Sequence, residues 1–184
     1  YYPDNTPVSI TFENGILTVA AAVESTTGMQ KTIQFSLAET GSQVLVTHSL
    51  TNHGAWPVEV APWALTCMAV GGTAVLPLPP RGSHESQLLP SSSLVLWAYT
   101  DLSDPRWTFT TEGVLLKADG LSTTPQKIGA PVPSEWLAYA RDGHLFVKQF
   151  EHLASATYPD NGCSGELFVI NYMLEVESLA PLGV

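Results

Sequence analysis

Short stretches in which apolar and polar residues alternate fill most of the chain. Residues 31–37 place Ile33, Phe35 and Leu37 on one side and threonine, glutamine and serine on the other, and residues 44–50 repeat the pattern. A period of two is typical of a β-strand with one buried face. Further strands are predicted at 8–12, 16–20, 94–97, 107–111, 114–118, 136–140, 144–150, 168–172 and 174–179, and residues 58–70 form a long bent strand or a strand pair.

Turn signals separate these stretches. Asn14-Gly15 and Asp142-Gly143 each join two predicted strands and favour tight hairpins. Fourteen glycines and fourteen prolines punctuate the chain, and no amphipathic stretch is long enough for a helix of three turns. The pattern therefore predicts an all-β fold, an antiparallel β-sandwich or barrel, built as a single domain over residues 1–184.

Residues 81–107 are the least regular part and form two long loops around a short strand. Long loops in a compact domain are often functional, because ordering them costs conformational entropy. His84 and Arg106 lie in these loops and are candidates to bind an acidic or hydroxylated ligand. The alternative is that both are surface loop residues, with Arg106 pairing with Asp101 or Asp104.

The composition argues against two classes of partner. The chain contains seven basic and 17 acidic residues, for a net charge of −10, and such a surface repels nucleic acid and anionic lipid. No apolar run is long enough to span a bilayer. Cys67 in an apolar strand is interpreted as a buried small hydrophobe, and spacing cannot show whether Cys163 bridges to it. No zinc-like Cys/His spacing occurs, and no metal or other cofactor is expected.

Three glutamates lie near the end of the chain. Glu166 follows the turn-rich loop 158–163, and Glu175 and Glu177 share one face of the last predicted strand, either as a carboxylate pair or, as we favour, as a solvated face. The tetrapeptide Tyr-Pro-Asp-Asn occurs at 2–5 and again at 158–161. It predicts two turns, or alternatively two loops that offer Asp4 and Asp160 to one metal or sugar.

Aromatic and basic side chains supply further candidates. Trp63 and Trp107 suit the apolar C–H face of a pyranose, although a tryptophan is more often part of the core. Lys127 and Lys148 are notable in a chain with so few basic residues. Either could neutralise a uronate carboxylate or one of the glutamates.

Several segments resemble galactose mutarotase-like (aldose epimerase-like) proteins. Residues 44–52 and 57–65 are similar to the central strands of that superfamily, and residues 162–167 and 174–182 to its closing strands. The proline-rich loop and the Ser103–Trp107 stretch are most similar to an uncharacterised bacterial branch. The resemblance covers most of the chain and implies a supersandwich fold. Members of the branch are longer, so the resemblance also implies that N-terminal strands are lacking.

The resemblance also implies candidate chemistry. In mutarotases a glutamate on a late strand, shortly after a cysteine, removes the proton of the anomeric hydroxyl, and Glu166 matches that position with one extra residue after Cys163. A histidine acts as the acid. His53 lies in a similar Leu-Thr-Asn-His motif but comes one turn too early, so the acid is absent or supplied elsewhere.

These observations predict a carbohydrate-active protein that binds a sugar or oligosaccharide on one concave sheet face. Glu166 would be the catalytic residue if proton transfer occurs, as in an epimerase, a glycan lyase or a hydrolase. Alternatives are a non-catalytic carbohydrate-binding module and a structural or assembly domain that forms a homodimer. The sequence does not indicate a cellular location.

Overall fold

The computed structural model describes residues 6–171 and 173–182. The chain divides into two compact units, one up to Glu59 and one from Val60 onward. Nearly all regular structure in both is antiparallel β-sheet, so the predicted all-β sandwich class is confirmed. That residues 1–184 act as a single domain stays a prediction.

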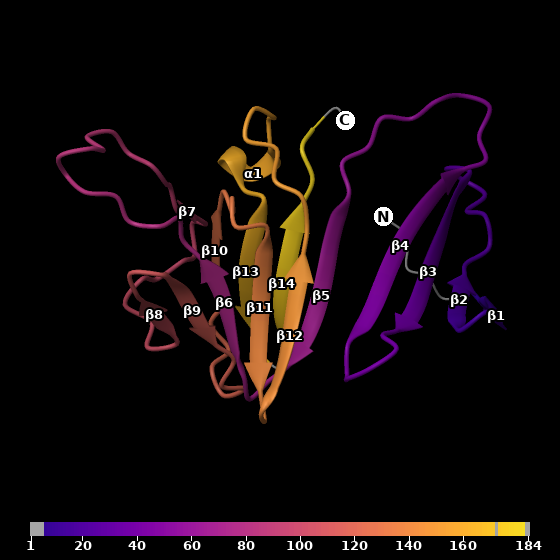
Figure 1. Ribbon diagram of the computed structural model, residues 1–184, viewed down its shortest axis with the longest axis horizontal. Helices are drawn as coiled ribbons and strands as arrows, with labels where there is room; N and C mark the ends of the chain where they lie inside the picture. The colour runs from indigo at the N-terminus through magenta and orange to yellow at the C-terminus, as the bar shows by residue number, and fades with distance from the viewer. Residues whose placement is uncertain (1–5, 172, 183–184) are drawn as a thin grey trace. The chain divides into compact units, whose positions relative to one another are not determined.

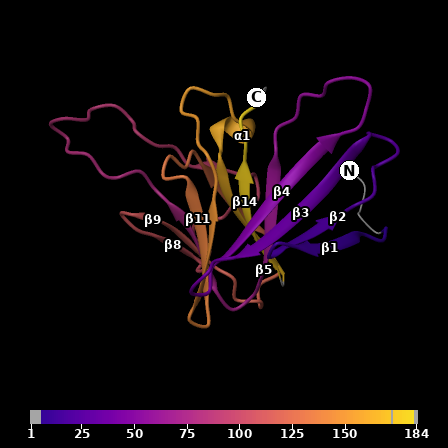
Figure 2. The same cartoon turned by 45° about the vertical axis from the view of Figure 1, so that its right-hand side comes forward.

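The first unit is a four-stranded meander (Figure 2). Asn14 and Gly15, which connect the first two strands, both have positive φ, 51° and 80°, as the predicted hairpin turn requires. The strands are β1 (Ser9–Glu13), β2 (Ile16–Ala20), β3 (Met29–Leu37) and β4 (Val44–Asn52).

The two faces of this first sheet differ sharply in polarity. The cross-strand row Phe12, Leu17, Phe35 and Val46 is apolar, and the next row, from Thr11, is made of threonine and glutamine. Within the unit the apolar face stays largely uncovered, and the Phe12 side chain is 70% exposed. The alternation read from the sequence is therefore present in the sheet.

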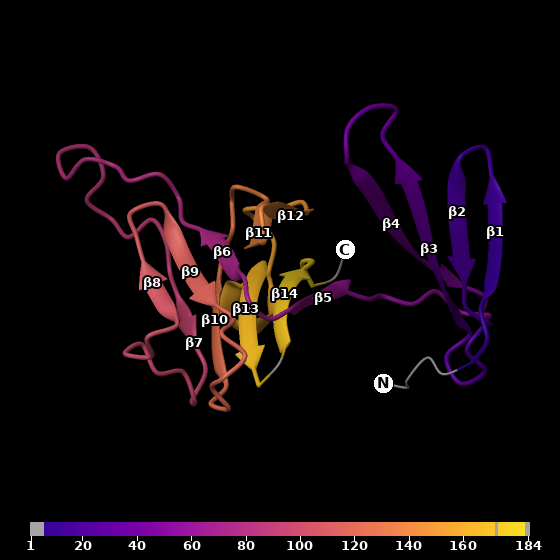
Figure 3. The ribbon, with the colours of Figure 1, turned by 90° about the horizontal axis from the view of Figure 1, so that it is seen from below.

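The second unit is a sandwich of two five-stranded sheets, which Figure 3 shows as two layers. Sheet B has the order β5-β14-β13-β10-β7, and sheet C the order β12-β11-β6-β9-β8. The strands, labelled in Figure 1, are β5 (Trp63–Ala69), β6 (Thr73–Pro77), β7 (Val95–Leu96), β8 (Trp107–Phe109), β9 (Gly113–Lys117), β10 (Gln126–Ala130), β11 (Trp136–Arg141), β12 (His144–Gln149), β13 (Gly165–Ile170) and β14 (Met173–Leu179).

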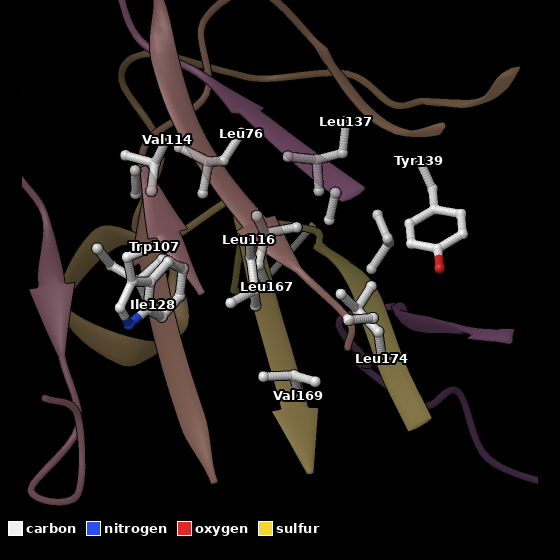
Figure 4. Close-up of a cluster of buried hydrophobic side chains, with 14 of the residues drawn as sticks. Leu76, Trp107, Val114, Leu116, Ile128, Leu137, Tyr139, Leu167, Val169 and Leu174 are labelled. Carbon is white, nitrogen blue, oxygen red and sulfur yellow. The ribbon is translucent and has the colours of Figure 1, made fainter. Parts of the chain in front are cut away.

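The core lies between sheets B and C. Leu76 and Leu116 of sheet C meet Leu167 and Leu174 of sheet B, all with no exposed surface (Figure 4). Burying a leucine contributes roughly 2–3 kcal/mol relative to leaving it exposed. Side chains on the inner face of each sheet therefore stabilise the sandwich. The opposite face of sheet B does not contribute to this core.

The strand boundaries differ from the predicted ones in several places. Only residues 63–69 of the long apolar stretch 58–70 form a strand, and the segments Thr73–Pro77 and Gln126–Ala130 are additional central strands. Both additional strands are short and flanked by glycine or proline, so their local pattern resembles a turn. Tertiary pairing on both sides makes them strands.

The second Tyr-Pro-Asp-Asn copy forms a single tight turn, labelled α1 (Pro159–Gly162). Asp160, Asn161 and Gly162 all have positive φ, 49°, 57° and 94°. A left-handed conformation is uncommon for residues other than glycine, and asparagine and aspartate tolerate it best. The turn predicted here is confirmed, while the copy at 2–5 with Asp4 lies outside the described residues. No described helix is long and apolar enough to cross a membrane.

Candidate functional site

The candidate site lies on the face of sheet B that points away from the core, here called the outer face. In β13, Leu167 and Val169 point into the core. Because side chains alternate along a strand, Glu166 and Phe168 point outward. The strand register then places Gly129, Glu166 and Glu177 side by side across three strands. Lys127 lies one row further along the same face, opposite Phe168.

A lysine and two glutamates form an ion cluster in the middle of this face. Lys127 Nζ donates to both carboxylate oxygens of Glu177, at 2.9 and 3.1 Å, and lies 2.7 Å from Glu166 Oε2. The Glu166 contact is an ion pair without hydrogen-bond direction, and neither carboxylate oxygen of Glu166 has a hydrogen-bond partner among the described residues. Trp63 Nε1 donates to Glu177 at 2.9 Å.

The two carboxylates therefore have unequal environments. Burial raises the pKa of Glu166 to about 7, although Lys127 opposes the shift, and Glu177 and Asp160 add to it. Burial opposes the charge on Lys127, but its carboxylate contacts outweigh that effect and raise its pKa. One ammonium is shared by two buried carboxylates, and Glu177 has the better hydrogen bonds. Burial therefore brings the pKa of Glu166 close to neutral pH.

Aromatic rings surround this cluster. Lys127 Nζ lies 4.7 Å from the centre of the Trp97 ring and 5.7 Å from that of Phe168, which are cation–π distances. Tyr99 packs edge-on against Phe168 and is 41% exposed, and Trp63 is 54% exposed. These rings rim a polar centre, an arrangement that suits the mixed apolar and hydroxylated faces of a sugar.

Access to the cluster is restricted. Lys127 keeps 12% of its side chain exposed, whereas Glu166 has none and Glu177 1%. Trp97 contributes to this cover, and it follows β7, which is only two residues long and pairs with β10 alone. A ligand on the outer face therefore meets Lys127 before either glutamate.

Gly129 makes the close packing beside Glu166 possible. A Cβ at this position would lie 2.6 Å from Cys163 Sγ, 3.1 Å from Glu166 Cγ and 3.2 Å from Trp97 Cη2. Cys163 is fully buried, and burial raises the pKa of its thiol to about 12. The thiol is therefore a packing group beside Glu166 rather than a nucleophile.

Arg106 and Trp107 are not available to a ligand, in contrast to the prediction. Arg106 is 3% exposed and pairs with Asp104 through Nε and Nη2, at 2.9 and 2.7 Å. Trp107 is 7% exposed, donates to Gln126 and packs beside Ile128 in the core (Figure 4). The alternative of Arg106 pairing with an aspartate is confirmed, and Trp107, at the start of the edge strand β8, serves the core.

Lys148 also lies away from the outer face. It reaches from β12 across the sandwich to sheet B, and its Nζ donates to Ala64 O at 2.5 Å and to Thr66 Oγ1 and Val176 O at 3.1 Å. Burial lowers the pKa of Lys148 to about 8. It neutralises none of the glutamates by direct contact, so its predicted place at a ligand is not supported.

The two candidate histidines do not belong to the ion cluster. His84 is an exposed residue of the loop after β6, and no contact joins it to the cluster. His53 belongs to the first unit, where its Nε2 lies 3.0 Å from Gln30 Oε1. No contact therefore places His84 beside Glu166.

The remaining interpretations of single residues need two corrections. Cys67 is exposed rather than buried, because its strand β5 turns this side chain to the outer face beside Glu175. Glu175 and Glu177 do share one face, but Glu177 is fully buried in the cluster and not solvated. Both described cysteines are free thiols.

The sequence identified Glu166, Glu177, Lys127 and Trp63 as candidates but did not show how they combine. Trp97 and Glu177 complete the site, and Gly129 permits their packing. A signal for Trp97 was present, since it ends a short apolar strand in an otherwise irregular region. The pairing of β10 with β13 had no signal, because residues 126–130 contain no strong strand pattern.

Neither the described geometry nor the comparisons assign a metal or a family. Among residues 6–171 and 173–182 no group of three His, Cys, Asp or Glu side chains is placed to hold a metal ion. Comparison with protein-family models, curated proteins and solved structures gave no match.

Proposed function

We propose that this chain is a carbohydrate-active protein of the mutarotase-like kind, which binds a sugar on the outer face of sheet B. The observation that carries the proposal is Glu166, a fully buried carboxyl whose pKa is raised to about 7 beside Lys127. A group with a pKa near the working pH both takes up and releases protons efficiently. Buried carboxyls with perturbed pKa values cluster at functional sites.

The proposed chemistry is the interconversion of sugar anomers. Ionised Glu166 takes the proton of the anomeric hydroxyl, and the ring C–O bond breaks as the ring oxygen gains a proton. Lys127 is the proton donor to the ring oxygen, since its ammonium is the exposed member of the cluster. Closure on the other face of the carbonyl returns both protons and yields the opposite anomer.

The rings at the site have separate roles in this proposal. Trp63 and Tyr99 are exposed enough to contact the sugar directly. Trp97 lies beside Lys127 at a cation–π distance, and in this proposal the bound sugar displaces it. This requirement provides a means of excluding water from the reacting groups once the sugar is bound.

The test is proton NMR exchange spectroscopy of anomers for a panel of aldoses, with the wild type, Glu166→Gln and Glu175→Gln. General acid–base catalysis contributes about 10²- to 10⁴-fold, so Glu166→Gln should abolish measurable acceleration. Glu175→Gln, a half-buried carboxyl on the same face, is the matched control and should retain activity. Equal rates in wild type and Glu166→Gln, or no acceleration by the wild type, would refute the proposed chemistry.

A non-catalytic carbohydrate-binding module is the second candidate. It is favoured by the absence of exposed surface on Glu166 together with the exposed rings of Trp63 and Tyr99. Sugar-induced line broadening that persists in Glu166→Gln but is lost in Trp63→Ala, without anomer exchange in any variant, would establish it. The proposed homodimer is tested by light scattering, and the apolar face of the first sheet supports this assembly alternative.

A further inference from the structure

A second candidate binding site lies in a cleft formed by the loop 78–94, the end of β8 and the turn that follows β8. This loop projects well beyond the two sheets (Figures 1 and 3). The cleft is open to solvent and has a volume of about 490 Å³. It shares no lining residue with the Glu166 cluster.

The cleft is lined by an exposed arginine, Arg81, whose side chain is available to an anion. Arg81 makes no hydrogen bond or ion pair with any described residue. Arg106 and Lys127, by contrast, are already paired with carboxylates. In a chain of net charge −10, an arginine that lines a cleft without a carboxylate partner is a specific feature. Its planar fork matches carboxylate and sulfate groups.

The other lining groups suit a hydroxylated ring. Phe109 is 46% exposed at the cleft and stands with Pro79 and Pro80 as an apolar wall. Ser91 and Ser92 also line it, and their hydroxyls have no partner among the described residues. An aromatic ring contacts the C–H face of a pyranose, and free hydroxyls exchange hydrogen bonds with its OH groups.

The segment that carries Arg81 is locally organised. Ser86 N donates to Ser83 O at 3.2 Å, and the two hydroxyls lie 2.9 Å apart. The Gln87 side chain lies directly over Gly82, where a Cβ would collide with it. Part of the ordering cost of binding is therefore already met in the folded chain.

From these groups we propose that the cleft binds an anionic saccharide, a sugar that carries a carboxylate or a sulfate. Arg81 binds the anionic group, Phe109 contacts the ring face, and the Ser91 and Ser92 hydroxyls bind ring hydroxyls. The site operates independently of Glu166.

The experiment is a titration of the full chain followed by NMR, with selectively labelled phenylalanine to locate binding at Phe109. The probes are methyl glucuronide, methyl glucoside 6-sulfate, neutral methyl glucoside and acetate. At least one anionic sugar should shift the Phe109 signals and bind at least tenfold more tightly than the neutral sugar, as expected for hydrogen bonds to a charged group. Preference between the two anionic sugars identifies carboxylate or sulfate as the recognised group.

Three variants distinguish binding in the cleft from binding at the Glu166 cluster and from a general effect of charge. Arg81→Gln should weaken binding of the anionic sugar about tenfold or more. Lys117→Gln makes the same charge change on β9, at an exposed side chain outside the cleft, and should not weaken binding. Glu166→Gln should leave cleft binding intact, and Arg81→Gln should leave anomer exchange intact. The failure of one proposal is thus distinguishable from the failure of the other.

Several outcomes would overturn the inference. Equal affinity for the neutral sugar would show that the anionic group is not recognised. Acetate binding as tightly as the glucuronide would show that the sugar ring is not recognised. Unchanged affinity in Arg81→Gln, or the same loss in Lys117→Gln, would show that the cleft arginine is not the recognition group. Absence of any shift at Phe109 with all four probes would exclude the site.

Discussion

Replacing Gly129 with alanine tests whether Trp97, Cys163 and Glu166 are packed against one another as the structure shows. The backbone of Gly129 does not have positive φ, so alanine meets no conformational barrier there. The new Cβ would lie 2.6 Å from Cys163 Sγ, about 1 Å inside an optimal contact. The effect of the substitution therefore combines the overlap with the smaller backbone gain of alanine over glycine.

The expected magnitude follows from this overlap. Overpacking a filled site costs about 1–3 kcal/mol, and alanine in a strand regains roughly 0.5–1 kcal/mol relative to glycine. From the midpoints of these two ranges we expect Gly129→Ala to lower the free energy of unfolding by about 1 kcal/mol. Cys163→Ala removes the nearest atom, so the double variant should be more stable than the sum of the single effects by about 1 kcal/mol.

Rescue should be partial, because Glu166 Cγ and Trp97 Cη2 remain at 3.1 and 3.2 Å. The assay is urea unfolding followed by tryptophan fluorescence, with equal m-values required for comparison. Cys67→Ala, at the exposed cysteine, is the control and should change stability by less than about 0.5 kcal/mol. Additive effects of Gly129→Ala and Cys163→Ala, or no loss in Gly129→Ala, would contradict the described packing.

Three further predictions concern pH and the core. In the folded chain the pKa of Glu166 is about 7, raised from 4.5. Its contribution to the free energy of unfolding is therefore full below pH 4.5 and is lost as pH rises through 7. Glu166→Gln should remove this loss of stability, about 3 kcal/mol at most, from urea unfolding measured across that pH range. Lys148 has a folded pKa of about 8, lowered from 10.5, so unfolding takes up protons between these values and stability rises there by up to about 3 kcal/mol; Lys148→Met should abolish that rise, and an unchanged profile would refute its burial. Leu76→Ala, at a fully buried core position, should cost about 2–5 kcal/mol of unfolding free energy, whereas Leu121→Ala, 87% exposed, should cost less than about 0.5 kcal/mol in the same assay.

Local patterns predicted much of the fold because they depend only on neighbouring residues. Asn14-Gly15 and Asp142-Gly143 both adopt the positive φ values that their hairpins need. The strands around them also fall close to the predicted ranges. Strands such as Gln126–Ala130, which contain glycine and polar residues, carry no such signal and form because β13 and β7 pair with them on either side.

The candidate site was less predictable, because its members are far apart in the chain. Glu166 and Glu177 are close in sequence, and the resemblance pointed to Glu166. Lys127 meets them only through the register of β10 with β13. Arg106 and Arg81 show the limit most clearly. Both are arginines in irregular loops, yet one is buried against an aspartate and the other lines an open cleft.

The sequence by itself determined the all-β class, the hairpin turns, the acidic surface charge and the identity of the residues available for chemistry. These properties follow from composition and from side-chain alternation within a strand. The tertiary structure decided which carboxylate is buried, which lysine pairs with it and which aromatic rings cover it. Burial and pairing set the pKa of Glu166, and both depend on contacts between strands that are distant in sequence.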